Sequence, residues 1–544
     1  MPVPWETIAQ KAQEHRDATI SLVEPGLPEI TDLPLDSSPV PKAILTPEEL
    51  AITESDPVDL VSSLASGTLS SVNATNAFLR RAALAQKLVN CITELLPNAA
   101  LERAKYLDDY LKKHGKPIGP LHGLPISVKE HVKMKGRTVN AGFIAWYDRV
   151  ADRNAHILDI FLAAGAVLYV RTTQPQTLMH LETSSNFYGQ TVNPFNRNLT
   201  SGGSSGGEGA LVGMRGSCLG IGTDIGGSIR SPAANCGVYG LRPTSYRLPI
   251  EGLSATMLGQ EQIVPVIGPI TTSLGGVKLF MKTLIDAKPW IREPSLVPFP
   301  WRTEPQVPAN GGGIKKLKIA ILWDDGVVKP HPPITRALKT VAEKLKGVEG
   351  ITLVNWEPYK HDYAWTIISS LYFCDGGSEE ATAIEGSGEP WRPLSRFILT
   401  DNPNVKKLGI RDVWDWTLKR DDFRAEYSQL WGDVDVILCP VGPGPAPLHD
   451  TARYWGYTSQ WNLLDYPALI VPITKVDPEV DVAEKNYKPR NEKDRYNYEF
   501  YEPEKFANAP VSLQLVGRRY DDEKLIEVME YIQKSIGLPF TNFV

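Results

Sequence analysis

The sequence predicts an α/β fold with a mostly parallel or mixed β-sheet. Two observations support this class: short apolar runs of strand length recur along the chain, and helical patterns lie between several of them. Strands that alternate with helices are typical of sheets whose faces are covered by helices. The chain has 544 residues, of which 42% are hydrophobic and 22% charged, as in an ordinary globular protein with a large core.

The predicted strands are short apolar runs that stand apart from the more polar sequence around them. They span Pro125–Val128, Ala166–Val170, Leu317–Leu322, Val434–Cys439, Leu469–Val471 and Val511–Val516. Helix is predicted over Ser70–Lys113, where Arg and Lys recur between Ala and Leu. A last helix is predicted after Asp521, a residue type that caps helices, because apolar residues recur at helical spacing over Leu525–Ile532.

The chain divides into a short first segment and a long remainder. Residues 1–45 are rich in Pro, Asp and Glu and show little periodicity, so we expect an arm on the surface. The stretch from Lys288 to Asn310 carries many prolines and is predicted to be a long connection. The sequence leaves open whether that connection is a domain boundary or a surface loop within one domain.

The charge balance argues against a nucleic-acid-binding protein. Lys and Arg total 57 and Asp and Glu total 63, which gives a net charge of −6. A broad nucleic-acid surface needs a basic excess, and the chain has no lysine-rich run. We therefore expect no nucleic-acid partner.

Cysteine usage and the first residues favour a cytoplasmic protein. The five cysteines are widely spread and form no CxxC pair, which is typical of reduced thiols. The chain begins without a basic start or an apolar signal segment. Its longest apolar stretch, Ile157–Val170, is interrupted by Asp159 and is too short to span a bilayer, so no transmembrane segment is expected.

The chemistry is expected in a glycine- and serine-rich stretch over residues 201–232. A flexible linker is the alternative for such a composition. The flanks argue against it, because Glu208–Val212 resembles the opening of a helix and Gly220–Ser228 alternates glycine with other residues, as tight packed turns do. Glycine lets backbone N–H groups approach a ligand closely, so this stretch could form an oxyanion hole.

Several other catalytic motifs lose support here. Gly202–Gly206 matches the GxSxG nucleophile elbow, but that motif needs a strand directly before it and residues 196–200 are mostly polar. GxGxxG, GxxxxGK followed by Ser or Thr, HExxH and SxxK do not occur. Phosphate-loop, zinc-protease and penicillin-recognising functions are therefore disfavoured.

Lys129 is the candidate base for these serines. It ends an apolar run that reads GLPISVK over Gly123–Lys129. A surface lysine at a strand end is the alternative. Lysine can act as a base only when it is neutral, so this hypothesis requires burial or neighbouring positive potential to lower the pKa from about 10.4, and we expect a closed pocket.

At these residues the chain resembles the amidase signature family. The signature GGSSGGEGALVG occupies Gly202–Gly213 and GTDIGGSIRSPAA occupies Gly222–Ala234, after the GLPISVKE segment. The resemblance extends over roughly residues 45–540 and is greatest to the fungal acetamidases. It implies a single large domain over residues 46–544, with a signature core at about 120–240 and a central mixed, twisted β-sheet flanked by helices.

The resemblance also implies roles for individual residues. It assigns Lys129 as the base, Ser204 as a bridging serine in a cis peptide, and Ser228 as the nucleophile. The oxyanion hole is expected from the backbone N–H groups of Ile225, Gly226, Gly227 and Ser228. Leu178 and Met179 are expected to line the acyl pocket. No metal or organic cofactor is expected.

Other residues near the motif are expected to support the site. Ser205 could hydrogen-bond Lys129, and Asp224 and Arg230 are expected to brace the loops. The histidines are expected to be structural, notably His131, His180 and His449.

The implied substrates are small aliphatic amides such as acetamide. Aryl anilides, carbamates and longer fatty amides remain open, because the sequence does not place the residues that set pocket volume. Two more distant alternatives are a Ser-His-Asp esterase that uses Ser204 or Ser205, and a subunit of an amidotransferase. A homodimer is left open on general grounds.

Overall fold

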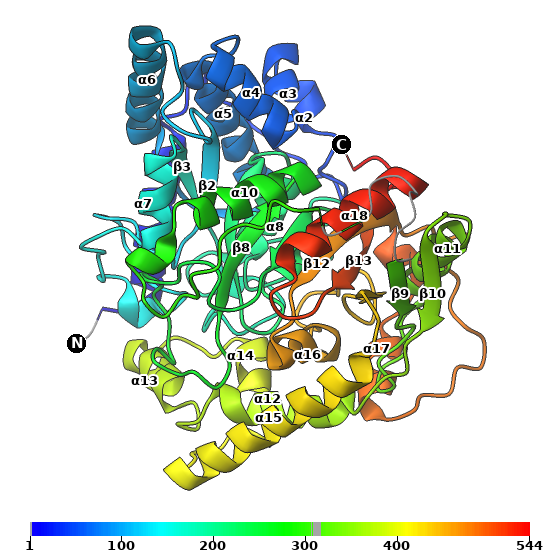
Figure 1. The fold of residues 1–544 in the computed structure, drawn as a ribbon. Helices are drawn as coiled ribbons and strands as arrows, with labels where there is room; N and C mark the ends of the chain where they lie inside the picture. The colour runs from blue at the N-terminus through cyan, green and yellow to red at the C-terminus, as the bar shows by residue number, and fades with distance from the viewer. Residues whose placement is uncertain (1–2, 306, 308–316, 544) are drawn as a thin grey trace.

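The chain is built around one β-sheet of eleven strands (Figure 1). This computed structural model describes residues 3–305, 307 and 317–543. The strands of the large sheet are β1 (Ile92–Leu95), β2 (Pro125–Lys129), β3 (Val167–Thr172), β6 (Leu219–Asp224), β7 (Tyr239–Arg242), β8 (Val266–Thr271), β9 (Leu317–Ile321), β10 (Ile351–Asn355), β11 (Val436–Pro440), β12 (Ala468–Lys475) and β13 (Pro510–Val516). A separate two-stranded sheet pairs β4 (Ser184–Ser185) with β5 (Gly189–Gln190).

Helices surround this sheet, and irregular segments connect them to its strands. The α-helices are α1 (Trp5–Ile20), α2 (Pro41–Ile44), α3 (Pro47–Thr53), α4 (Pro57–Ser66), α5 (Ser71–Val89), α6 (Pro97–His114), α7 (His156–Ala163), α8 (Gly206–Gly213), α9 (Arg230–Asn235), α10 (Leu274–Asp286), α11 (Pro332–Lys346), α12 (His361–Tyr372), α13 (Ser378–Ser387), α14 (Pro393–Ile398), α15 (Ile410–Trp431), α16 (Gly456–Leu464), α17 (Glu492–Glu499) and α18 (Asp522–Ile536). Short 3₁₀ turns are η1 (Ile144–Trp146), η2 (Pro289–Ile291) and η3 (Pro503–Phe506).

The sheet is mixed, as predicted. Its strand order is β1-β3-β2-β6-β8-β7-β12-β13-β11-β9-β10. The pairs β3/β2, β2/β6, β11/β9 and β9/β10 are parallel, and the other neighbours are antiparallel. Strand β2 therefore lies inside the parallel part, between β3 and β6, and carries Lys129 at its end.

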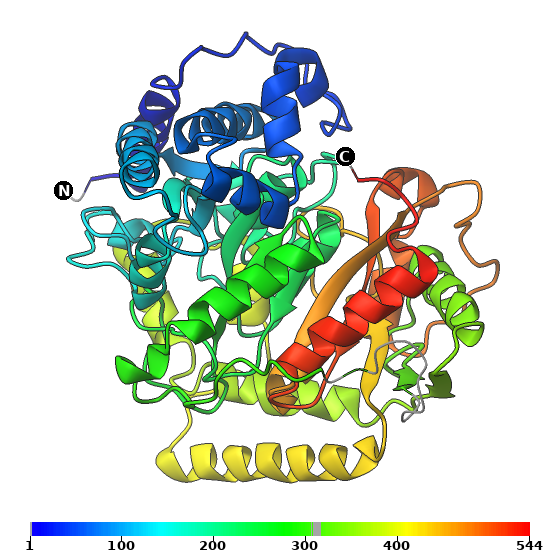
Figure 2. The same ribbon diagram turned by 45° about the horizontal axis from the view of Figure 1, so that its top comes forward.

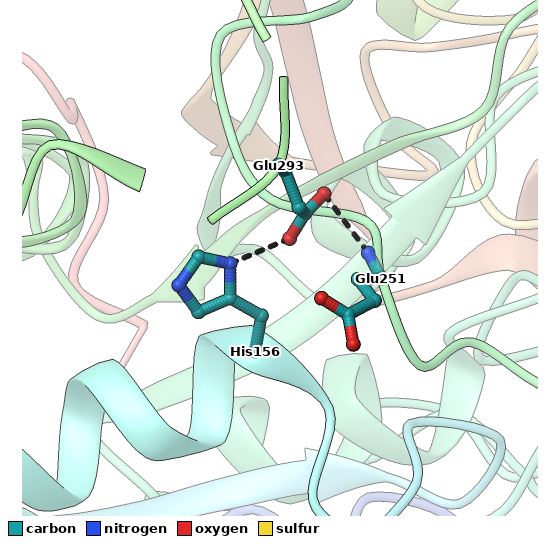
Figure 3. A group of neighbouring side chains, drawn as sticks. All are labelled: His156, Glu251 and Glu293. Atoms are coloured by element: carbon teal, nitrogen blue, oxygen red, sulfur yellow. Dashed lines mark hydrogen bonds and ion pairs between the residues drawn. The ribbon is translucent and has the colours of Figure 1, made fainter. Parts of the chain in front are cut away.

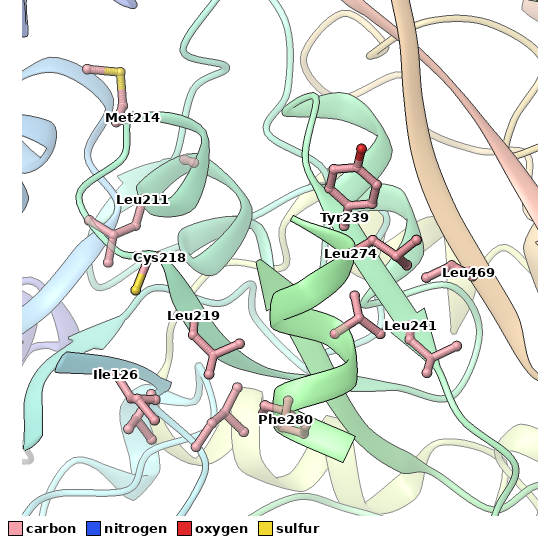
Figure 4. Packing of buried hydrophobic residues seen from close by; sticks show 14 of the residues in the cluster. Ile126, Leu211, Met214, Cys218, Leu219, Tyr239, Leu241, Leu274, Phe280 and Leu469 are labelled. Atoms are coloured by element: carbon pink, nitrogen blue, oxygen red, sulfur yellow. The ribbon is translucent and has the colours of Figure 1, made fainter. Parts of the chain in front are cut away.

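The sheet is buried on both faces, which explains why its strands are continuous apolar runs. On β12, Leu469 and Val471 join a cluster that contains Leu274 and Phe280 of α10, whereas Ile470 points to the opposite face and joins Ala233 of α9. Figure 4 shows Leu469 and Leu241 beside Leu274 of α10. In Figure 2, α10 and α18 lie across the front of the sheet. The site described below lies on the other face, the one covered by α8, α9 and α16.

Two sequence-based assignments of secondary structure were wrong. The helix predicted over Ser70–Lys113 is interrupted by β1, which separates α5 from α6 and pairs with β3. The stretch predicted as turns from Gly220 begins as strand β6, and the turn starts only after Asp224. Its glycines mask the strand pattern, and one reason for them is steric: a Cβ on Gly220 would lie 2.0 Å from the Glu208 carboxylate.

The segment predicted as an arm contains helices. Helix α1 covers Trp5–Ile20 and packs against β1. It buries only Ala9 and Ala12 fully, so its apolar stripe is narrow and leaves a weak periodic signal. Figure 1 shows this part of the chain at the outside of the molecule, on one edge of the sheet.

The proline-rich connection does not separate two sheets. Strands from both sides of residues 288–310 belong to the same eleven-stranded sheet. Within its described part, regular structure is limited to η2, and residues 306 and 308–310 lie outside the described residues. Among the helices that the structure describes, none has both the length and the apolar character needed to cross a bilayer.

Candidate active site

Lys129 ends β2 inside the protein and is surrounded by hydroxyl groups. Its side chain is fully buried. The Nζ atom donates to Ser204 Oγ at 2.7 Å, to Ser205 Oγ at 3.0 Å and to Thr223 Oγ1 at 3.0 Å. A hydroxyl both donates and accepts, so these three partners can satisfy a neutral amine as well as an ammonium ion. The predicted contact between Ser205 and Lys129 is confirmed.

Burial changes the protonation equilibrium of this lysine. Desolvation lowers the pKa of Lys129 to about 7, although the negative charges of Asp224 and Glu208 oppose that shift. No carboxylate in the described part of the chain forms an ion pair with Nζ. A substantial fraction of the side chain is therefore neutral near neutral pH, which is the state a base requires.

The two serine loops meet next to Lys129. The Gly203–Ser204 peptide bond is cis, as the resemblance implied. The Ser205 N–H donates to the carbonyl oxygen of Ser228 at 3.2 Å, which joins the loops through their backbones. Ser204 and Ser228 both line one cavity, and both are nearly buried, at 2% and 4% exposed.

The turn that carries Ser228 is held from behind through its carbonyl groups. The Ile225 carbonyl accepts from the Tyr372 hydroxyl at 2.9 Å, and the Gly226 carbonyl accepts from Thr458 Oγ1 at 2.6 Å. Gly227 has φ of +134°, and a Cβ there would lie 2.5 Å from Thr458 Oγ1, so only glycine fits. The carbonyls of Ile225 and Gly226 are thus fixed on one side of the turn. In each trans peptide the N–H group points away from the carbonyl, towards the other side.

The N–H groups of this turn differ in whether they already have a hydrogen-bond acceptor. Among the described residues, no hydrogen bond engages those of Ile225, Gly226 and Ser228. The Gly227 N–H already donates to Asp224 Oδ1 at 2.9 Å. Three of the four predicted oxyanion donors are therefore free, and the fourth is shared with Asp224.

A buried ion pair fixes both ends of the same turn. Arg230 donates Nε to Asp224 Oδ2 and Nη2 to Asp224 Oδ1, each at 3.0 Å. Burial alone would raise the pKa of Asp224, but Arg230 and Asn462 lower it to about 2. Arg230 also donates Nη1 to the Thr458 carbonyl at 2.8 Å. The prediction that Asp224 and Arg230 brace the loops is confirmed.

Glu208 connects α8 to strands β2 and β3 through hydrogen bonds near Lys129. Its carboxylate accepts from Ser127 Oγ at 2.5 Å and from Thr172 Oγ1 at 2.8 Å. Ser127 and Lys129 alternate with apolar residues on β2 and so face the same side of the sheet. Desolvation raises the pKa of Glu208 to about 7. Glu208 thus holds the helix that starts directly after the two serines.

The cavity at Ser228 has a volume of about 420 Å³ and is partly open to solvent. Leu178 and Met179, which were expected to line the acyl pocket, lie in the wall of this cavity. The loop of residues 250–265 forms much of the remaining wall, with Ile250, Leu253, Ala255, Met257, Leu258, Val264 and Pro265 as its apolar members. The wall around the nucleophile candidate is therefore mainly apolar.

The histidines His131, His180 and His449 contact groups other than Ser204, Ser205 and Ser228. His131 lines the cavity, but its Nε2 lies 3.0 Å from Thr223 Oγ1 and its Nδ1 lies 3.0 Å from the Ser254 carbonyl. Burial lowers the pKa of His131 well below its usual value. His180 contacts Ser395 at 2.7 Å, and His449 contacts the Arg197 carbonyl at 3.1 Å. These contacts agree with structural roles.

One histidine and two carboxylates could in principle hold a metal ion. Ligand atoms of His156, Glu251 and Glu293 lie within 4.8 Å of one another (Figure 3). Glu293 accepts from His156 Nδ1 at 2.7 Å and from the backbone N–H groups of Ile250 and Glu251 at 2.9 and 3.1 Å. Both Glu251 carboxylate oxygens accept from Arg292. These carboxylates are already paired, so the cluster fits an anchor for the loop at residue 250 better than a metal site.

Three residues of the site were missed by the sequence-based reasoning. Thr223 lies at the end of β6, and Tyr372 and Thr458 come from α12 and α16. Thr223 lies near the end of a glycine-containing strand, and nothing local in the sequence marks it as a partner of Lys129. Tyr372 and Thr458 lie far along the chain from the turn they hold, and nothing local in the sequence marks them.

Comparison with known proteins agrees with this fold. The sequence model of the amidase family matches residues 73–526. An acetamidase of Emericella nidulans is 41% identical over 99% of this chain and 99% of its own length, and an acetamidase of Aspergillus oryzae is 40% identical over 98% and 99%. A solved structure of a fatty acid amide hydrolase is 37% identical, with a TM-score of 0.93 over 98% of this chain and 95% of that one. The chain therefore belongs to the amidase family, the amidase signature enzymes, and is an amide hydrolase.

Proposed function

We propose that the protein hydrolyses carboxylic amides through an acyl-enzyme on Ser228, with Ser204 as the proton bridge and Lys129 as the base. The observation that carries this proposal is the contact of Lys129 Nζ with Ser204 Oγ at 2.7 Å in a fully buried pocket. A serine hydroxyl is a weak nucleophile until a neighbouring base takes its proton. A buried lysine with a pKa of about 7 can do so near neutral pH.

The first half-reaction forms the acyl-enzyme. Neutral Lys129 takes the proton of Ser204 as Ser204 takes the proton of Ser228, and Ser228 Oγ attacks the amide carbonyl carbon. The tetrahedral intermediate then breaks its C–N bond. Protonated Lys129 returns its proton through Ser204 to the leaving nitrogen, which departs as ammonia or an amine.

The second half-reaction releases the acid. A water molecule gives its proton to Lys129 by the same relay and attacks the ester carbonyl. The second tetrahedral intermediate breaks its bond to Ser228 Oγ, which takes a proton from Ser204 as Ser204 recovers its own from protonated Lys129. The products are one carboxylic acid and one amine, and the enzyme returns to its starting state.

The negative charge of both intermediates needs donors that are already in place. We assign this role to the N–H groups of Ile225, Gly226 and Ser228, because no protein acceptor engages them within the described residues. The Gly227 N–H is shared with Asp224, so we expect a smaller contribution from it. Removal of one such donor typically costs about 2.7–4 kcal/mol of transition-state stabilisation.

We propose small aliphatic amides such as acetamide as substrates, on the similarity to the two fungal acetamidases. The cavity supports a second class of substrates, namely amides with a larger apolar or aryl part. Its volume of about 420 Å³ is well beyond what acetamide fills and lies within the roughly 300–1,000 Å³ of pockets for drug-sized ligands. The apolar wall formed by Leu178, Met179 and the loop of residues 250–265 supports this second class.

The test is ammonia release from acetamide, benzamide and hexanamide by wild type, Ser228→Ala and Ser204→Ala. We expect nearly complete loss of activity in both variants, with unchanged circular dichroism spectra. The ratio of kcat/KM values among the three amides reports which substrate group the cavity prefers. Full activity of Ser228→Ala would contradict the proposed nucleophile.

We further propose a cytoplasmic location on the basis of the cysteines. All five are free thiols, and four of them are buried. Such a set persists in a reducing compartment. Cell fractionation with an antibody against the untagged protein would test this, and recovery mainly from a secreted or membrane fraction would contradict it.

A further inference from the structure

A second cavity lies behind the wall of the catalytic cavity and is lined by four arginines. Its volume is about 160 Å³, which is the volume of roughly five water molecules. The arginines are Arg242 at the end of β7, Arg420 and Arg424 on α15, and Arg519 after β13. The chain thus brings guanidinium groups from three separate elements to one small space.

The carboxylates around this cavity do not balance the arginines. Asp465 is shared by Arg242 and Arg519, each at 2.7 Å. Asp421 pairs with Arg420 at 2.8 Å and lies 3.8 Å from Arg424. These are four cations and two anions.

Glu261 is the third acidic residue at this cavity. It lines the space, is exposed, and forms no ion pair within the described part of the chain. Even if its charge is counted, the side chains around the cavity carry one positive charge in excess.

Arg424 has the least compensated charge of the four. Its Nε donates to the Leu463 carbonyl at 2.6 Å, whereas its terminal nitrogens make no hydrogen bond to any described residue. Arg420 precedes it by four residues on α15, and like charges at that spacing repel. Burial lowers the pKa of Arg424 to about 10, and Arg420 contributes to that shift. An anion in the cavity would remove this repulsion.

We propose that this cavity binds a small oxyanion, a phosphate or a carboxylate, between Arg424 and Arg519. Guanidinium groups present paired N–H donors that match the oxygens of carboxylate and phosphate. The Nε of Arg519 is taken by Asp465, and its terminal nitrogens, like those of Arg424, make no hydrogen bond to the described residues. Arg519 is 44% exposed at its side chain, which gives the ion access from solvent.

The site shares a wall with the catalytic cavity. Tyr246, Glu261 and Val264 line both spaces. Arg420 donates Nη1 to the Gln262 carbonyl at 2.5 Å and so fixes the loop between them. The oxyanion could therefore come from solution, or it could be the distal carboxylate of an amide substrate. The second source rests on the proposed function.

The alternative is that the arginines only brace the loop and the C-terminal end of α16. That alternative predicts no saturable binding of anions. The two explanations are distinguished by a binding measurement that needs no catalysis.

The first experiment measures binding of inorganic phosphate to the full-length protein by calorimetry and by the change in Tm, against chloride at matched ionic strength. We expect saturable binding to wild type and to Ser228→Ala, and its loss in Arg424→Gln. Arg411→Gln is the matched control, because Arg411 is exposed on the same helix and forms no ion pair with the described residues. If Arg424→Gln fails to fold, Arg519→Gln replaces it. Absence of saturable binding to wild type, or binding unchanged in the arginine variant, overturns the proposal.

The second experiment identifies the source of the oxyanion. It compares kcat/KM for hexanamide and for the monoamide of adipic acid in wild type and Arg424→Gln. If the substrate supplies the carboxylate, kcat/KM of the variant falls about tenfold or more for the acidic amide alone, since hydrogen bonds to charged groups are stronger than those between neutral groups. If Arg424→Gln changes kcat/KM by the same factor for both amides while phosphate binding is lost, the site binds a free oxyanion. Phosphate binding by Ser228→Ala keeps this result independent of whether the proposed mechanism is correct.

Discussion

Lys129 Nζ lies 2.7 Å from Ser204 Oγ, and neither residue is more than 2% exposed. This contact places an amine of lowered pKa beside a hydroxyl that shares a cavity with Ser228. The chemistry proposed for the protein depends on this contact, and the following predictions test it and its surroundings.

The pH dependence of kcat/KM should have an acid limb near pH 7. The folded-state pKa of Lys129 is lowered to about 7, so the neutral base appears as the pH rises through that value and the rate rises with it. Glu208 titrates at about the same pH, so the apparent pKa belongs to the pair. A profile measured with hexanamide that is flat through neutral pH would contradict this assignment.

Glu208→Gln should move that acid limb to lower pH. The negative charge of Glu208 favours protonated Lys129, and the amide removes this charge. The amide can still bond the hydroxyls of Ser127 and Thr172, because each hydroxyl can reverse its role. We expect an unchanged Tm for this variant and a clearly lower Tm for Glu208→Ala, which loses both contacts. An acid limb that stays at its wild-type position would exclude the proposed charge coupling.

Tyr372→Phe and Thr458→Val should lower kcat about tenfold with little change in KM. Each removes a hydroxyl that holds a carbonyl of the Ser228 turn, and an unpaired buried carbonyl costs about 1–3 kcal/mol. A factor of ten corresponds to about 1.4 kcal/mol. Tyr531→Phe, which removes a hydroxyl bond to Glu349 far from the site, is the control. Equal losses in all three variants would point to general destabilisation.

Asp224→Asn should destabilise the fold by about 3–5 kcal/mol, because it leaves Arg230 as an unpaired buried charge. In the wild type the folded-state pKa of Asp224 is lowered to about 2. Its contribution to stability is therefore present above the ordinary aspartate pKa and is lost as the pH falls towards 2. Urea unfolding of variant and wild type at neutral pH tests this, with Asp433→Asn as an exposed control. A variant as stable as the control would show that the pair is not important for folding.

Leu178→Trp should lower kcat/KM for hexanamide and benzamide more than for acetamide. Leu178 lines the cavity and has a positive φ, so both side chains meet a similar backbone cost and differ in size. The measured quantity is the ratio of kcat/KM values between hexanamide and acetamide. A ratio equal to that of wild type would place the acyl group elsewhere.

The parts of the site that could be predicted are local in sequence. Lys129 ends an apolar run, and the serines lie in glycine-rich loops whose conformation depends on neighbouring residues. The contacts of Tyr372 and Thr458 could not be predicted, because each joins the Ser228 turn to a helix far along the chain. Their position is set by how the sheet brings α12 and α16 onto one face.

In the fold, too, the features with a local sequence signal were predicted and those that depend on tertiary contacts were not. The strand that ends at Lys129 and the strand that contains Leu469 were predicted, because burial on both faces gives continuous runs of apolar residues. Strand β1 was hidden between two long helices, and β6 was hidden by its glycines. Of those glycines, Gly220 is required by the close approach of the Glu208 carboxylate, which is a tertiary contact.

The central claim is that Lys129 is the base. Its most direct test is the rate of ammonia release from hexanamide by Lys129→Ala, compared with wild type and with Lys135→Ala, a change at an exposed lysine nearby. We predict loss of nearly all activity in Lys129→Ala, with the fold retained and Lys135→Ala unaffected. If Lys129→Ala keeps most of the wild-type rate, the Ser–Ser–Lys mechanism is wrong and a histidine-based hydrolase must be reconsidered.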